Sequence, residues 1–195
     1  MYYGPVRSER YFEKGRRYSE IEWTNFAEAV EAFDHRIRGW YIDPTENLIK
    51  QSGHHSFTVM AMTCLLIDAL SQYRYGELFS EGKHFKRFVE DFLPSYKGSL
   101  PHPVWHYDHN YNQGGKRLRK YSEVLWNGYR CGILHEGHAP LYCGINPGDS
   151  PPYIEATGHA KYGAKATAST VGADCPVVIV YPEHLFKEVT AFFSG

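Results

Sequence analysis

The sequence predicts a mainly α-helical protein with a small C-terminal β appendage and a terminal helix. Apolar residues recur every three to four positions over residues 20–33, which is typical of an amphipathic helix. Residues 56–70 are apolar nearly all round, as expected for a buried helix. After residue 140 the composition changes to short β-branched runs between glycine- and alanine-rich stretches. With 195 residues, the chain suits one domain, with a helical core over about 20–137 and the appendage and terminal helix over about 139–195.

The first helical elements are read from periodicity and proline. The amphipathic stretch from about Glu20 to Phe33 predicts the first helix. Asp43-Pro44-Thr45 predicts a break, after which Pro44 opens a second, short helix through Ile49. The apolar segment 56–70 is then the central helix of the core.

Two further helices follow, separated by a predicted loop. A helix fits residues 83–92 and stops at Pro94. Residues 98–115 are rich in Pro, His, Asn and Gly, which predicts an extended loop. The next helix begins near residue 116 and has an apolar stripe of Leu118, Tyr121, Leu125, Tyr129 and Ile133. Gly128 and Gly132 on this helix favour the close approach of another helix.

The C-terminal part of the chain predicts strands and a last helix. Residues 141–144, 153–156 and 176–181 have the composition of short strands. Residues 182–193, which begin with proline and glutamate, predict the terminal helix.

Charge and cysteine content limit the function classes. The formal net charge is −1, so contact with nucleic acid requires a local basic patch rather than bulk charge. The four cysteines are widely spaced without a C-x-x-C pair, and the first residues lack an apolar signal core. The most apolar run, 57–70, includes Asp68 and is too short to cross a bilayer. We therefore expect reduced thiols, a cytoplasmic location and no membrane span.

The most informative segment is Arg130-Cys131-Gly132-Ile133-Leu134-His135. At about 100° per residue, positions five apart lie roughly 140° apart on an α-helix. Arg130 and His135 therefore meet at one phosphate only if the helix ends near the histidine or a second subunit completes the site. Gly137 and Pro140 predict that His135 lies in the last turn, where exposed carbonyls favour a protonated imidazole.

This segment resembles the R-x4–6-H motif of the HEPN superfamily, helical domains found in RNA-cutting toxins, antiphage systems and RNA-processing enzymes. Arg36 and Arg38 before Asp43-Pro44, and the segment 62–68, resemble the earlier helices in one group of uncharacterised bacterial HEPN-like proteins. One position differs, because Cys131 stands where many active members have Asn, Asp or His.

The resemblance implies a HEPN-like helical bundle that acts as a metal-independent endoribonuclease in defence or toxin-like regulation. RNA supplies the nucleophile, its 2′-hydroxyl, so no cofactor is expected. His135 would exchange protons with the reacting oxygens and Arg130 would hold the phosphate. The resemblance also implies a homodimer, and an antitoxin or other regulatory partner that keeps such an enzyme silent.

Two other readings remain open. In the first, the same cleft binds RNA or a nucleotide without cutting, consistent with Cys131. In the second, the motif helix forms a dimer interface, with Arg130 neutralising the helix end and His135 capping it.

Asp68 is the third candidate site residue. A lone carboxylate on an otherwise apolar helix is costly unless it has a partner. It either orients Arg130 or His135, or forms a structural ion pair with Arg36 or Arg38.

A basic cluster precedes the motif. Lys116, Arg117, Arg119 and Lys120 are expected at the start of the motif helix, where cations oppose the macrodipole. This cost suggests a track for RNA phosphates leading to Arg130, although a solvated charged face is the alternative.

No functional metal site is expected. His135-Glu136-Gly137-His138 is one residue short of H-E-x-x-H and lies at a predicted helix end. His102, His106 and His109 share the predicted loop, where they suit adventitious binding of a transition metal.

Overall fold

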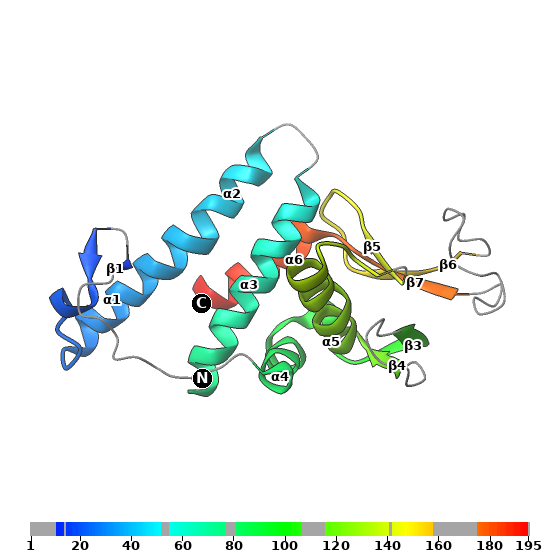
Figure 1. Cartoon of the computed structure of the whole chain (residues 1–195), viewed down its shortest axis with the longest axis horizontal. Helices are drawn as coiled ribbons and strands as arrows, with labels where there is room; N and C mark the ends of the chain where they lie inside the picture. Colours follow the sequence, from blue (N-terminus) through cyan, green and yellow to red (C-terminus); the bar gives the residue numbers. More distant parts are fainter. Residues whose placement is uncertain are drawn as a thin grey trace. The chain divides into compact units, whose positions relative to one another are not determined.

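The computed structural model describes residues 11–13, 15–51, 55–76, 81–106, 116–140, 142–157 and 175–194. The chain is mainly helical, with small sheets and a C-terminal helix (Figure 1). It divides into two compact units, Met1–Ser52 and Gly53–Gly195, which are described separately. A single domain over the whole chain stays a prediction. Within the described residues, no helix has the length and apolar character needed to span a bilayer.

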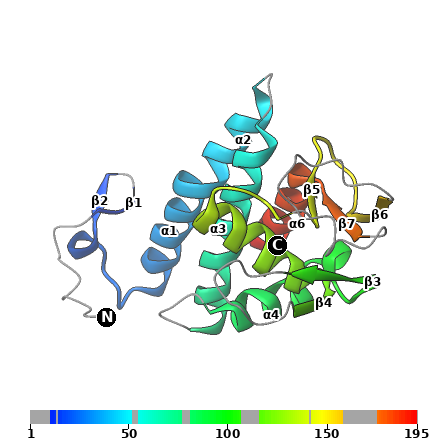
Figure 2. The ribbon, with the colours of Figure 1, turned by 45° about the vertical axis from the view of Figure 1, so that its right-hand side comes forward.

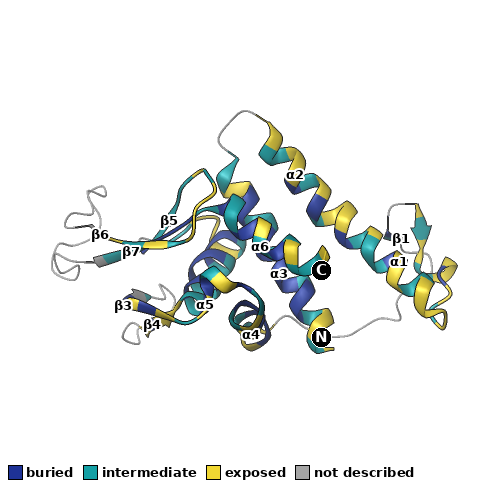
Figure 3. Ribbon diagram, turned by 180° about the vertical axis from the view of Figure 1, so that it is seen from behind, coloured by how far each residue is buried: buried dark blue, intermediate teal, exposed yellow. Residues whose placement is uncertain are grey.

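The larger unit is built around α3 (Ser56–Tyr75), which confirms the predicted central helix and extends it by a turn. Helices α4 (Gly82–Phe92), η4 (Leu125–Glu136) and α6 (Pro182–Ser194) pack against α3 (Figure 2). Its buried side chains include Met60, Cys64, Leu66 and Ile67. Figure 3 shows long buried stretches on α3. Gly76 ends α3 in the left-handed conformation, at φ 68°, which a glycine adopts without a steric penalty.

A two-stranded sheet lies where the sequence predicted a loop and the start of the motif helix. β3 (Ser99–His106) lies in the stretch predicted as a loop, and β4 (Lys116–Lys120) lies where the motif helix was expected to begin. The strands are antiparallel, with Val104 opposite Leu118. Leu118 is the one buried residue of β4, and its neighbours on both sides are exposed. Prolines in β3 concealed its signal, since proline is tolerated only in an edge strand such as this one.

The C-terminal sheet and helix agree with the prediction. β5 (Cys143–Ile145), β6 (Tyr153–Thr157) and β7 (Cys175–Val180) form one sheet in the order β5-β7-β6. β7 pairs parallel with β5 and antiparallel with β6, and α6 follows it directly. A 3-10 turn, η3 (Pro94–Tyr96), connects α4 to β3, and a short helix, α5 (Tyr121–Val124), connects β4 to η4.

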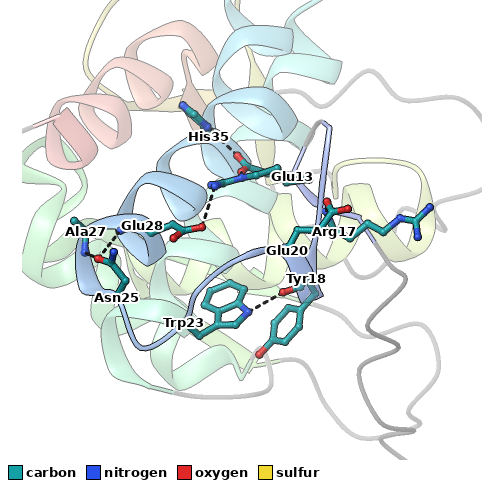
Figure 4. Close-up of polar contacts among 10 residues, drawn as sticks. Glu13, Arg17, Tyr18, Glu20, Trp23, Asn25, Ala27, Glu28 and His35 are labelled. Carbon is teal, nitrogen blue, oxygen red and sulfur yellow. Dashed lines mark hydrogen bonds and ion pairs between the residues drawn. The ribbon is translucent and has the colours of Figure 1, made fainter.

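The smaller unit begins with a hairpin of β1 (Tyr11–Glu13) and β2 (Arg16–Arg17), followed by a 3-10 turn, η1 (Tyr18–Glu20). Helix α1 (Phe26–Ile37) starts later than predicted, because the Asn25 side chain accepts the N–H groups of Ala27 and Glu28 and caps it (Figure 4). Figure 4 also shows the buried Glu13 carboxylate facing His35.

The predicted break at Pro44 is wrong. A π-helical segment, η2 (Arg38–Ile42), joins α1 directly to α2 (Asp43–Lys50), so the chain is helical from Phe26 to Lys50. The N–H of Asp43 donates to the Arg38 carbonyl five residues earlier. The wider turn accommodates the proline ring, which would clash with a carbonyl in a regular α-helix.

Candidate functional site

The candidate site lies on η4, and the hydrogen-bond pattern of η4 determines its geometry. η4 is a π-helical segment that ends at Gly137, whose N–H donates to the Gly132 carbonyl five residues earlier. Residues five apart are hydrogen-bonded in this frame, and their side chains therefore share a face. The sequence reasoning assumed α-helical geometry, which would have separated Arg130 from His135. Gly137 has φ 72°, which confirms the predicted helix end after His135.

Arg130 and His135 are in direct contact. The Arg130 guanidinium nitrogen NH1 lies 2.6 Å from His135 Nε2. Arginine has no acceptor, so NH1 donates and the imidazole accepts. In this contact Nε2 therefore carries no proton. His135 is exposed, so a ligand reaches the pair from solvent.

Asp68 on α3 holds the other edge of the same guanidinium. Arg130 donates to Asp68 Oδ2 from Nε at 3.2 Å and from NH2 at 2.8 Å. The side chains of Arg130 and Asp68 are only 15% and 7% exposed, which makes this ion pair largely buried. A charge-assisted pair in such surroundings fixes the guanidinium plane.

The alternative partners of Asp68 bind within their own unit. Arg36 donates to the Phe12 carbonyl, and its guanidinium lies over the rings of Phe12 and Trp40. Arg38 donates to both carboxylate oxygens of Asp34 at 3.0 Å. Asp68 pairs with Arg130, which is one of the partners predicted for it.

Trp126 is a member of the site that the sequence reasoning missed. The Arg130 guanidinium carbon lies 4.8 Å from the centre of the Trp126 ring, a cation–π distance. The indole contacts Phe85 and covers Gly82, whose Cβ, if present, would lie 2.6 Å from Trp126 Cε2. An aromatic residue four positions before an arginine on a helix was the available signal.

The C-terminal sheet anchors η4. The Tyr129 hydroxyl is buried 2.8 Å from the Gly144 carbonyl oxygen and 2.7 Å from that of Val178. A Cβ on Gly128 would lie 2.2 Å from Cys143 Sγ. Another element does approach Gly128 closely, but it is strand β5 and not the helix that the sequence predicted.

The thiols near the site are protonated and therefore poorly reactive. Burial raises the pKa of Cys131, against the opposing effect of the adjacent Arg130 guanidinium. Burial also raises the pKa of Cys64, which lies on α3 one turn before Asp68. Cys64, Cys131 and Cys143 are free thiols, and their raised pKa values make them poor nucleophiles.

The basic cluster lies on β4 rather than on the motif helix, so the predicted conflict with the macrodipole does not exist. All four cations, Lys116, Arg117, Arg119 and Lys120, are exposed. Lys120 Nζ lies 3.5 Å from Glu90 of α4. The structure thus brings Arg130, His135 and Asp68 together and puts the four cations on the preceding hairpin.

A second polar cluster, absent from the sequence reasoning, surrounds His184 on α6. His184 Nδ1 lies 3.2 Å from Asp149, and Nε2 lies 3.1 Å from Ser95 Oγ and 3.3 Å from Glu188. The order Ser–His–Asp is that of a hydrolase triad. However, Glu188 shares Nε2 and accepts the Ser95 N–H, so an imidazole that donates to Glu188 cannot take the serine proton. We interpret this cluster as structural, because it joins α6 to Ser95 and Asp149.

Metal ligands do not gather in the part of the chain that the structure describes, where no three His, Cys, Asp or Glu side chains form a metal-binding group. His102 and His106 lie on β3, and His109 lies outside the described residues. His106 Nδ1 is 2.6 Å from the Tyr142 hydroxyl, and His138 pairs with Glu136.

Comparisons of the chain with protein-family models, with curated proteins and with solved structures found no match.

Proposed function

We propose that this protein is a metal-independent endoribonuclease with a HEPN-like helical bundle. The observation that supports the proposal most directly is the 2.6 Å contact between Arg130 NH1 and His135 Nε2 at the exposed end of η4. A fixed cation beside an accessible imidazole is the smallest set of groups that can catalyse cleavage of RNA, because the RNA itself supplies the nucleophile.

The proposed reaction begins at the ribose 2′-hydroxyl. Its oxygen forms a bond to phosphorus while the bond from phosphorus to the 5′-oxygen breaks, leaving a cyclic phosphate and a 5′-hydroxyl. The ligand displaces Arg130 NH1 from His135 Nε2, and the protonated His135 then donates its Nε2 proton to the departing 5′-oxygen. The 2′-hydroxyl proton passes to water or to the histidine of a second motif, and general acid–base help of this kind contributes about 10²–10⁴ in rate.

Arg130 stabilises the charge that gathers on the phosphate oxygens. Asp68 binds its Nε and NH2 edge, so the NH1 group next to the imidazole is the part available to the phosphate. One imidazole does not easily serve both oxygens, and we therefore propose a symmetric homodimer in which two motifs share the work.

We propose that the exposed cations of β4 bind the RNA backbone. Lys116, Arg117 and Arg119 lie on the strand that leads through α5 into η4, so their charges precede the site along the chain. The proposed location is the cytoplasm, where the free thiols of Cys64, Cys131 and Cys143 stay reduced. An antitoxin or similar protein is the proposed regulator of the activity.

The test is incubation of the purified chain with structured and single-stranded RNA in EDTA, followed by analysis of the fragment ends. Wild type is expected to leave cyclic phosphates and 5′-hydroxyls, and His135→Ala is expected to leave RNA intact. His138→Ala is the matched control, because His138 is exposed near the same helix end and pairs with Glu136 instead. Intact RNA across the panel, or equal cleavage by His135→Ala, would contradict the proposal.

The second candidate function is RNA or nucleotide binding without cleavage. It is favoured by Cys131, a half-buried thiol with a raised pKa where many active HEPN members have Asn, Asp or His. In that case wild type binds RNA saturably without cutting it, and Arg130→Lys, which keeps the charge but changes the donor geometry, weakens binding. If the motif is purely structural, neither wild type nor Arg130→Lys binds RNA.

A further inference from the structure

We propose that the Arg130–His135 pair binds one phosphodiester group with the uptake of one proton by His135. The inference rests on the proposed function, because it takes the RNA backbone as the ligand. It adds that Arg130 and His135 block each other in the empty site. Arg130 NH1 and His135 Nε2, the two groups that would bind the phosphate, are hydrogen-bonded to each other.

The empty site has a neutral imidazole. Arg130 NH1 donates to His135 Nε2, and a ring nitrogen that accepts this bond carries no proton. Protonation of the ring would put two donors and two positive charges 2.6 Å apart, so the contact and the imidazolium exclude each other.

The charge balance explains why a phosphate brings a proton with it. Asp68 lies 2.8 Å from Arg130 NH2, so the Arg130–Asp68 pair has no net charge before the ligand arrives. A phosphodiester adds one negative charge to this largely buried cluster. If NH1 turns to the phosphate, Nε2 is released, takes a proton from solvent and donates it to a second phosphate oxygen. The cluster of Arg130, Asp68, His135 and phosphate is then neutral again.

The other titratable side chains near the pair do not supply this proton. Cys131 has a raised pKa through burial and is neutral in both states. Glu136 lies 3.5 Å from His138, its partner at the end of η4. The titratable groups to be considered around His135 are therefore Arg130, Cys131 and Glu136 on η4, Asp68 on α3 and His138 after the helix.

The test is calorimetric titration with a thymidine dinucleotide, which has one phosphodiester and no 2′-hydroxyl and so is not cleaved. Titrations in two buffers of different ionisation enthalpy measure the protons taken up on binding. At pH values where the free imidazole is neutral, the binding constant should fall about tenfold per pH unit, the slope for one linked proton. Sulfate, titrated in parallel, shows whether a free anion suffices.

Variants distinguish His135 from other sources of the proton. His135→Ala and His135→Gln are expected to bind with the same heat in both buffers and without pH dependence, whereas His138→Ala should behave as wild type. Binding without proton uptake in wild type, uptake that persists without His135, or no saturable binding would overturn the inference. Saturable binding of sulfate without binding of the dinucleotide would overturn the assignment to the RNA backbone. RNA cleavage is measured separately, so a protein that takes up the proton but does not cut RNA refutes only the proposed function.

Discussion

Arg130→Ala should destabilise the larger unit strongly, in addition to abolishing cleavage. The substitution leaves the Asp68 carboxylate, which is 7% exposed, without the guanidinium that faces it. Removing one partner of a buried ion pair costs about 3–5 kcal/mol, and the partial exposure of Arg130 favours the lower end, about 3 kcal/mol. At about 2–4 °C per kcal/mol, Tm should fall by about 6–12 °C.

His135→Ala should separate function from folding. His135 is exposed, so its removal should change the free energy of unfolding by less than about 0.5 kcal/mol while cleavage is lost. Denaturant unfolding followed by circular dichroism measures both variants under the same conditions.

A double-mutant cycle tests the cause. Asp68→Asn in the Arg130→Ala background removes the carboxylate charge that Arg130 no longer neutralises and should recover at least about 1 kcal/mol of the loss. The reasoning is refuted if Arg130→Ala unfolds at the wild-type denaturant concentration, or if Asp68→Asn adds a further full penalty instead of relief.

Four further outcomes are expected from the packing and the thiols. Gly128→Ala should cost about 1–3 kcal/mol, because its Cβ would lie 2.2 Å from a strand sulfur, whereas Gly39→Ala, whose Cβ meets nothing within 4 Å, should not destabilise; equal effects in chemical denaturation would contradict the packing argument. Tyr129→Phe should cost about 1–3 kcal/mol, because the buried hydroxyl that donates its single proton to the Gly144 or the Val178 carbonyl is lost, and an unchanged unfolding midpoint would show that these carbonyls find another donor. His184→Ala should lower stability by about 1–3 kcal/mol, and wild type should resist fluorophosphonate labelling, since labelling of the neighbouring serine would mean a working triad. Cys131 should react with iodoacetamide more slowly than free cysteine at about pH 8, because burial raises its pKa and lowers the thiolate fraction. Mass spectrometry of the modified peptide measures the rate. A faster reaction would contradict the raised pKa.

Local patterns were sufficient to predict much of the larger unit. The apolar run now seen as α3, the proline before α6 and the β-branched run of β7 each specify one element with little help from the rest of the chain. The end of η4 was predicted equally well, because Gly137 adopts a left-handed conformation that few other residues tolerate.

Other elements were missed because their signals depend on contacts distant in sequence. β4 is a strand because Leu118 is buried and its backbone pairs with β3, and neither fact is visible in a run of cations. α1 and α2 are continuous because η2 widens the helix before Pro44, whereas proline by itself indicated a break.

The candidate site shows the same division. The residue types Arg130, His135 and Asp68, and the helix end after the histidine, were available from the sequence. Their meeting was not, because it requires the π-helical frame of η4, and the packing of Gly128 and Tyr129 against the C-terminal sheet accompanies that frame. The pairing of Arg130 with Asp68 follows from distances between α3 and η4 that only the tertiary structure determines.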